Sequence, residues 1–185
     1  MGNERYYYSP FSAELEDTIH AELDPIAKAL IERKQKVTTA ESLTGGLMSA
    51  YFVDMPGCSE WFSEGFVVYS AEAKIDRLGV SAELIERNTM LDAEVALEMA
   101  KGALRVTGCD YSVSMCGLGG PFFRKDGTPI PMDPRHSPGL TFVACACKYG
   151  EAVHTYTLTG SRPEIRRIAV LKAVRMLANM MNIVE

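Results

Sequence analysis

The sequence offers little that would build an extracellular protein, a membrane protein or a metal site. Its five cysteines are odd in number and form no C-x-x-C pair, which argues against a disulfide framework and a zinc knuckle. Three histidines (His20, His136 and His154) lie far apart and form no H-E-x-x-H or H-x-H motif, so no histidine-built metal site is expected. No apolar run approaches the roughly 20 residues that cross a bilayer, and the first residues lack the apolar core of a signal peptide. We therefore expect a cytoplasmic protein with reduced, mostly buried thiols.

Positive charge is also scarce. Lysine and arginine number 19 against 24 aspartates and glutamates, which gives a formal net charge of −5. Such a chain has no broad positive field for nucleic-acid phosphates, so general DNA or RNA binding is disfavoured. A length of 185 residues, with 47% apolar and 23% charged residues, is typical of one ordinary globular domain.

The chain divides into a short extension and a domain. Residues 1–12 contain three consecutive tyrosines and a Ser-Pro pair but no helical or alternating pattern, which predicts an N-terminal extension packed on the domain or on a partner. Residues 13–185 are expected to form a single domain. The tyrosines, together with the methionines near the C-terminus, suit a self-complementary interface in a homo-oligomer as well as simple core packing. The sequence leaves both open.

Apolar periodicity predicts alternating helices and strands. Strands separated by helices of this length favour an α/β fold, a three-layer α/β/α sandwich with a mixed sheet of about five strands. Between residues 117 and 139 lies one long irregular segment rich in proline, and loops of this length are usually functional or mobile. A helix is expected over about 13–23, and a second helix is expected from an N-cap at Asp24-Pro25 to Lys34. Further helices are expected over 47–53, 92–106 and 163 onward. Strands are expected over 37–40, 66–69, 111–115, 140–146 and 153–158.

A turn rich in hydroxyl groups follows the first expected strand. The segment Ser42-Leu43-Thr44-Gly45-Gly46 lies between a β-branched run and an apolar, helix-compatible stretch. Free N–H groups and the helix dipole at such a point stabilise a developing oxyanion. The alternative interpretation is that Ser42 and Thr44 only cap the following helix. The turn is not a P-loop, and the chain contains no G-x-S-x-G nucleophile elbow.

A nucleophilic serine needs a base, and with histidine scarce the candidate is Lys74. This residue lies near the start of a helix that follows an apolar strand, so its amine can reach the strand ends beside the serine turn. To act as a base near neutral pH, its pKa must fall from about 10.4 to about 7 or 8 through burial or a neighbouring cation. A solvated helix lysine is the alternative. Ser70, four residues earlier, is either a rival nucleophile or a helix N-cap.

Several motifs agree in order and spacing with one protein family. They resemble the C-terminal domain family of the competence-damage protein CinA over about residues 24–182. Stand-alone members of that family are nicotinamide-nucleotide amidohydrolases. The motifs are Thr39–Gly46 (TAESLTGG), Pro56–Ser59 (PGCS), Gly65–Lys74 (GFVVYSAEAK) with Leu78-Gly79-Val80, Asp110–Ser114 (DYSVS), Gly117–Pro121 (GLGGP), and Gly160-Ser161-Arg162 with Arg166.

The resemblance implies a hydrolase of pyridine-nucleotide salvage that works without a metal or any other cofactor. It would deamidate nicotinamide mononucleotide, its small-molecule partner, to nicotinic acid mononucleotide and ammonia. Ser42 matches the nucleophile and Lys74 the general base, while Tyr69 and Thr44 match positions that assist them.

The substrate-binding groups follow from the same resemblance. Backbone N–H groups near Gly45 and Gly46 would hold the oxyanion, and Gly119 and Gly120 belong to the glycine-rich loop that should line the nucleotide pocket. A cationic clamp for the substrate phosphate would come from Arg162 and Arg166, one turn apart at a helix start.

The chain departs from the family pattern at four places. Leu43 stands where the family has a cysteine after the nucleophile, and Ala71 stands where it has an asparagine before the Glu-Ala-Lys. Leu91 replaces the serine of the family's Ala-Val-Ser segment. The glycine-rich loop becomes Gly120–Arg124 (GPFFR), with about eight inserted residues before Gly139. Phe122 and Phe123 could stack on a planar ring, and Arg124 or Lys125 could meet a phosphate, so an altered preference among pyridine nucleotides is expected. The alternative is that the loop is a mobile surface excursion held by its prolines. The alternative function is a catalytically weak nucleotide-binding or regulatory module of the same fold.

Overall fold

The computed structural model describes residues 13–120, Thr128 and residues 135–183. The expected N-terminal extension lies outside the described residues, as does most of the proline-rich segment that was expected to form part of the nucleotide pocket.

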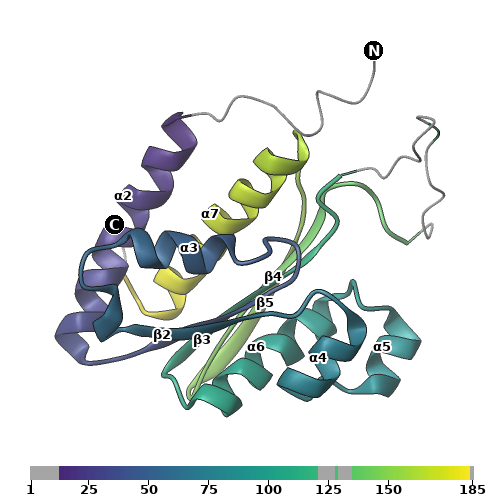
Figure 1. Cartoon of the computed structure of the whole chain (residues 1–185), viewed down its shortest axis with the longest axis horizontal. Coiled ribbons are helices and arrows are strands. Elements are labelled where there is room, and N and C mark those ends of the chain that lie inside the picture. Colours follow the sequence, from purple (N-terminus) through teal and green to yellow (C-terminus); the bar gives the residue numbers. More distant parts are fainter. Residues whose placement is uncertain (1–12, 121–127, 129–134, 184–185) are drawn as a thin grey trace.

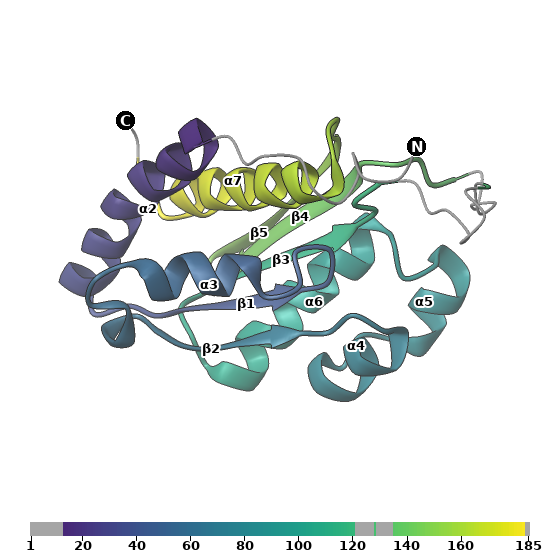
Figure 2. The same cartoon turned by 45° about the horizontal axis from the view of Figure 1, so that its top comes forward.

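One mixed sheet of five strands forms the centre of the described structure, in the order β2-β1-β3-β4-β5 (Figure 1). β1 runs parallel to both β2 and β3, whereas β4 is antiparallel to β3 and to β5. Helices cover both faces of the sheet (Figure 2), which confirms the predicted α/β/α sandwich. The strands are β1 Val37–Glu41, β2 Phe62–Val67, β3 Tyr111–Gly117, β4 Leu140–Cys147 and β5 Gly150–Thr157.

The edge strand β2 differs from the expectation. Its apolar run predicted a strand over 66–69, but the strand begins at Phe62 and ends at Val67, in parallel register with β1. An edge strand with an exposed face tolerates the polar stretch that precedes the apolar run, so hydrophobicity did not mark its start. The chain leaves the sheet after Val67, and Tyr69 therefore lies in the turn that leads to the next helix.

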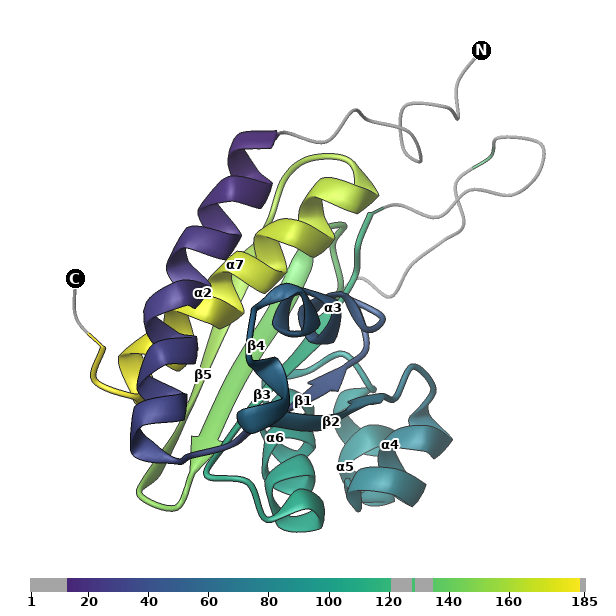
Figure 3. The same cartoon turned by 60° about the vertical axis from the view of Figure 1, so that its left-hand side comes forward.

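In the described part of the chain, α2, α3 and α7 cover one face of the sheet, and α4, α5 and α6 cover the other (Figures 1 and 3). None of these helices is both long and apolar enough to cross a membrane. The short α5, capped by Ser81, was not anticipated from the sequence. The helices are α2 Ala13–Arg33, α3 Leu47–Asp54, α4 Ala71–Leu78, α5 Ala82–Asn88, α6 Ala93–Thr107 and α7 Arg162–Met180, with a 3₁₀ turn over Cys58–Glu60.

The first two expected helices are in fact one. α2 continues through Pro25, although proline lacks an N–H and its ring crowds the carbonyl group four residues earlier. Ile19 and Leu23 before the proline, and Ile26 and Leu30 after it, are all buried in the same core. Packing of this continuous apolar face therefore outweighs the local break, and the expected N-cap at Asp24 is wrong.

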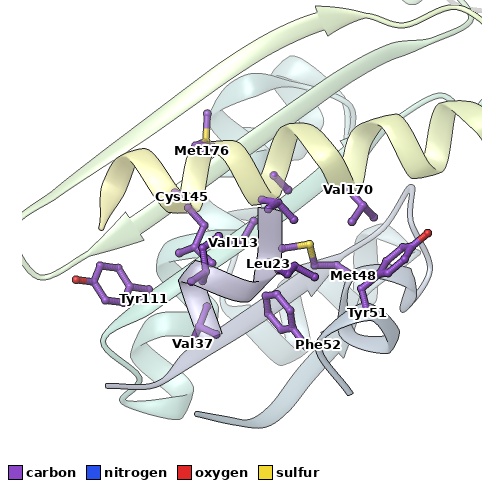
Figure 4. Packing of buried hydrophobic residues seen from close by; sticks show 14 of the residues in the cluster. Leu23, Val37, Met48, Tyr51, Phe52, Tyr111, Val113, Cys145, Val170 and Met176 are labelled. Atoms are coloured by element: carbon purple, nitrogen blue, oxygen red, sulfur yellow. The ribbon is translucent and has the colours of Figure 1, made fainter. Parts of the chain in front are cut away.

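Two hydrophobic cores lie on opposite faces of the sheet. The larger one joins the sheet to α2, α3 and α7, and Figure 4 shows Phe52, Met48 and Val113 meeting there. Met176, from the methionine-rich end of α7, is buried in this core, which favours core packing over an exposed interface for that residue. The smaller core lies beneath α4, α5 and α6.

The contact between α4 and α6 depends on a glycine. A Cβ atom added at Gly102 in α6 would lie 2.2 Å from the carbonyl oxygen of Leu78 and 2.8 Å from its Cβ. Gly102→Ala is expected to lower the free energy of unfolding by about 2 kcal/mol, even though alanine is the better helix former by about 1 kcal/mol. Urea denaturation measures the change. As a control, Gly150→Ala, where the added Cβ meets nothing within 4 Å, should change stability by less than about 0.5 kcal/mol. An unchanged midpoint in Gly102→Ala would contradict the prediction.

Candidate active site

The predicted serine turn lies where several elements converge. β1 ends at Glu41, and the following residues, Ser42–Gly46, which we call the nucleophile loop, lead directly into α3. The backbone N–H of Ser42 donates to the carbonyl group of Met115 in β3, at 2.9 Å. The starts of α3, α4 and α7 lie at this same end of the sheet (Figure 3). The expected site residues, distant in sequence, are brought together here.

Ser42 and Lys74 form a buried pair. The Nζ atom of Lys74 lies 3.2 Å from the Oγ atom of Ser42. The relative exposure is 0% for Lys74 and 5% for Ser42. Nζ also donates to the carbonyl oxygens of Val68, at 2.8 Å, and Tyr69, at 3.2 Å. Lys74 is therefore not a solvated helix lysine.

Burial lowers the pKa of Lys74. Nearby, the thiol of Cys116 is itself buried, with a pKa raised to about 12, so it is neutral near pH 7 and offers no counter-charge. A neutral amine has two N–H donors and one lone pair. When the amine is neutral, its two N–H groups can donate to the two carbonyl oxygens, and its lone pair can then face the hydroxyl of Ser42. This arrangement suits a free amine that accepts the serine proton.

Ser70, the rival nucleophile, is the N-cap of α4. Its Oγ accepts from the N–H of Ala73 at 3.1 Å, as the capping alternative expected. By contrast, α3 is not capped by Ser42 or Thr44: its N-cap is Gly46, with φ of 92° and no side-chain cap. The hydroxyl groups of the nucleophile loop are thus not used as caps.

Glu41 performs that capping role, and the sequence reasoning missed it. Its buried carboxylate accepts from the N–H groups of Gly46, Met48 and Ser49, at 2.8 to 3.1 Å, and from the hydroxyl of Ser49 at 2.7 Å. A carboxylate bound by the first N–H groups of a helix is stabilised by the helix dipole. The sequence signal for this role was a charged residue at the end of a buried strand, where an unpaired charge would cost folding free energy.

Thr44 and Arg166 hold the loop from its other side. The Nη2 atom of Arg166, at the start of α7, donates to the carbonyl oxygen of Thr44. Burial lowers the pKa of this guanidinium, with the neighbouring Arg162 and Arg167 adding to the effect. The hydroxyl of Thr44 is fully buried and has no hydrogen-bond partner among the described residues. Arg166 is thus engaged with the loop, and the Thr44 hydroxyl is available to a bound group.

The two loop glycines have different roles. Gly45 and Gly46 have φ angles of 61° and 92°, a region that favours glycine. Because the N–H of Gly46 donates to Glu41, it cannot hold an oxyanion. Among the described residues, the N–H groups of Leu43, Thr44 and Gly45 have no acceptor, so they are the donors that could do so.

Tyr69, Arg162 and two glycines form the mouth of the site. The Nη2 atom of Arg162 lies 3.5 Å from the hydroxyl of Tyr69, whose relative exposure is 56%. A Cβ atom at Gly119 would lie 3.2 Å from both Arg162 and Leu43, which places this glycine between them; Gly120 follows with φ of 145°. Arg162 therefore lies beside the exposed Tyr69, whereas Arg166 donates to the nucleophile loop.

Three of the four departures from the family pattern lie on described residues. Leu43 is buried with Leu158 and Ile165 against α7, so it anchors the loop. Ala71 is the first residue of α4 and is partly exposed. Leu91 precedes Asp92, whose side chain caps α6, so the substitution leaves that cap intact. Phe122, Phe123 and the insertion lie outside the described residues.

All five cysteines are free thiols. Cys116 and Cys145 are buried, but Cys58, Cys109 and Cys147 are partly exposed, so the expectation of mostly buried thiols is wrong. No group of three or more potential metal-ligating side chains gathers in the described part of the chain.

The protein is thus a mixed α/β/α sandwich that carries a buried serine–lysine pair at the end of its first strand. Residues 20–181 match the CinA C-terminal domain, and the chain belongs to this family. Among solved structures, a CinA superfamily protein of Escherichia coli is 28% identical with a TM-score of 0.78, covering 97% of this chain and 99% of that one. A competence/damage inducible protein of Agrobacterium tumefaciens is 29% identical with a TM-score of 0.81, covering 95% and 99%.

Curated relatives are longer than this chain. A protein of Acetivibrio thermocellus named as competence-damage inducible is 38% identical over 151 residues, which is 82% of this chain but 35% of the relative. A CinA-like protein of Fervidobacterium nodosum is 38% identical over 154 residues, 83% of this chain and 36% of the relative. The chain thus spans about a third of the length of these relatives.

Glu41→Gln is expected to disturb the nucleophile loop. The amide replaces one acceptor oxygen by an NH₂ group that faces N–H donors, so we expect a loss of about 2–3 kcal/mol in the free energy of unfolding. Any hydrolytic activity should fall at least about tenfold, because the loop carries Ser42. Urea denaturation and activity measurements test both. Glu64→Gln, at an exposed glutamate of β2, is the matched control and should change stability by less than about 0.5 kcal/mol. Equal stability of the two variants would contradict the capping role.

Proposed function

We propose that this protein is an amidohydrolase with a serine–lysine dyad, and that it deamidates nicotinamide mononucleotide or a closely related nucleotide amide. One observation carries the proposal: the amine of Lys74 is fully buried, is satisfied by two carbonyl groups and lies 3.2 Å from the hydroxyl of Ser42. Among the described residues, no carboxylate pairs with this amine to keep it charged. Family membership supports the assignment of the pair.

In the first half-reaction, the Oγ atom of Ser42 attacks the carboxamide carbon while Nζ of Lys74 accepts the serine proton. The carbonyl electron pair moves to the oxygen, which becomes the oxyanion of a tetrahedral intermediate. Lys74 then delivers the proton to the amide nitrogen. As the carbonyl re-forms, the C–N bond breaks and ammonia departs. The acyl group remains bound to the Oγ atom of Ser42 as an ester.

In the second half-reaction, Lys74 accepts a proton from water, whose oxygen attacks the ester carbon. Collapse of this intermediate breaks the bond to Oγ, and Lys74 returns the proton to Ser42. The product is the carboxylic acid, and the enzyme regains its starting state.

Neighbouring groups supply the remaining interactions. The N–H groups of Thr44 and Gly45 are the donors assigned to the oxyanion, and the buried hydroxyl of Thr44 can pair with the bound amide. Arg162, at the mouth beside Tyr69, is assigned to the substrate phosphate. Arg166 acts through the loop that it holds. The activity would place the protein in pyridine-nucleotide salvage in the cytoplasm.

Ammonia release tests the proposal directly. The full chain is incubated with nicotinamide mononucleotide, and ammonia and nicotinic acid mononucleotide are measured together; equal amounts of the two are expected, with or without a chelator. Nicotinamide riboside, which lacks the phosphate, should react at least about tenfold more slowly. Nucleotide binding without ammonia release would overturn the enzymatic assignment and identify a nucleotide-binding module instead.

A further inference from the structure

A cavity lies at the end of the sheet opposite the candidate active site. It has a volume of about 610 Å³, within the range of small-molecule pockets. Its walls include the start of β3, the turn between β4 and β5, and the end of α7. Arg162 lies at the start of α7 and Met176 lines the cavity about four turns later, roughly 21 Å along the helix. The two sites are therefore separate.

The floor of this distal cavity is apolar and rich in sulfur. Met176, Met180 and Met181 of the α7 end line it together with Cys147, whose Sγ lies 3.5 Å from the Sδ of Met180. Thioether groups are polarisable and adapt to flat rings. Tyr149 lines the rim and is largely exposed. Such a surface suits a planar ring.

The guanidinium of Arg33 at the cavity favours an anion. Arg33 and His154 line it, whereas none of its described lining residues is an aspartate or glutamate, although the chain as a whole carries a net charge of −5. The Nη1 atom of Arg33 donates to the carbonyl of Met181 at 2.9 Å, which holds the guanidinium in place. Nζ of Lys148 lies 4.7 Å from the centre of the Tyr149 ring at the rim.

A free polar group also faces this region. Gln35 lines the cavity, and its buried Oε1 atom has no hydrogen-bond partner among the described residues. A carboxamide has acceptor and donor sides and can turn either one to a bound molecule. Its pairing with a ring amino group would satisfy an atom that the protein alone leaves unpaired.

We propose that the distal cavity binds a small nucleotide. The base packs against the methionines, a ring amino group pairs with Gln35, and the phosphate pairs with Arg33. This proposal does not rest on the proposed amidohydrolase activity, because it involves none of the residues assigned to that reaction.

Adenosine monophosphate is the probe, added to the full chain labelled with ¹³C at the methionine methyl groups. We expect the NMR signals of Met176 and Met180 to shift on titration, while the signal of Met48, in α3 beside the nucleophile loop, stays unchanged. Adenosine, which lacks the anion, and ribose 5-phosphate, which lacks the ring, should each bind at least about tenfold more weakly. Shifts confined to Met48, or none at millimolar probe, would overturn the proposal.

Variants locate the binding groups. Arg33→Met and Gln35→Leu should each weaken the affinity for adenosine monophosphate at least about tenfold. Arg105→Met is the matched control, because Arg105 also donates to one backbone carbonyl, that of Leu78, but lies on α6 outside the cavity. Equal weakening by Arg105→Met would show a loss of fold stability rather than of a ligand contact. Dimerisation through this face with no nucleotide binding would also overturn the proposal, by identifying an interface between copies of the chain.

Discussion

Ser42→Ala is expected to lower amidase activity at least about 10⁴-fold while leaving the fold intact. The Oγ atom is the proposed nucleophile, and its hydrogen bond in the structure is to Lys74. Without the hydroxyl, Lys74 keeps its two carbonyl acceptors, so the free energy of unfolding should change by less than about 1 kcal/mol. Ammonia release and urea denaturation measure the two effects.

Ser70→Ala is the matched control for this prediction. Removing the α4 cap should cost about 1 kcal/mol of stability and leave activity within about a factor of ten, because α4 carries Lys74 but Ser70 does not touch the reacting atoms. Activity that survives Ser42→Ala and disappears in Ser70→Ala would reverse the assignment of the nucleophile.

Lys74→Met is expected to abolish activity and to stabilise the protein. The loss of the base should reduce the rate at least about 10³-fold. Lys74→Arg should be equally inactive, because a guanidinium stays protonated above pH 12 and cannot accept the serine proton. Methionine fills a similar volume without a polar group, and we expect a gain of about 1–2 kcal/mol in the free energy of unfolding near neutral pH.

The gain in stability should depend on pH with a definite sign. Burial lowers the pKa of Lys74 in the folded state, so between this pKa and the ordinary value near 10.4 the unfolded chain binds more protons than the folded one. Wild-type stability therefore rises with pH across this window. The advantage of Lys74→Met should be largest below the folded pKa and should vanish above the ordinary value.

Urea denaturation at several pH values tests this dependence. Lys36→Met, at an exposed lysine, is the control and should change stability by less than about 0.5 kcal/mol at every pH. A constant difference between Lys74→Met and wild type across the whole range would refute a depressed pKa. The rate of ammonia release by the wild type should likewise rise with pH through the folded pKa, because only the free amine accepts the serine proton.

The local sequence pattern was sufficient to predict helices and strands whose apolar periodicity is clear over a short segment. The amphipathic stripe after Asp92 predicted α6, and the β-branched run before Ser42 predicted β1, because a buried face has the same period as the element that carries it. The placement of Ser42 and Lys74 at one sheet end also followed from the sequence, through the strand-to-helix order and the family resemblance. The distance between them did not.

The tertiary structure decided what depends on partners remote in sequence. Packing of α2 against the core carries that helix through Pro25, which local propensity alone would have broken. Burial of Lys74, with two carbonyl groups and, among the described residues, no carboxylate beside its amine, lowers the pKa on which the proposed chemistry depends. Glu41 caps α3 because β1 ends beside the start of that helix, where the carboxylate accepts from its N–H groups. Desolvation and hydrogen bonding between groups 32 positions apart, such as Ser42 and Lys74, have no counterpart in local composition. The sequence alone therefore determined which groups were present, and the fold determined their burial and their partners.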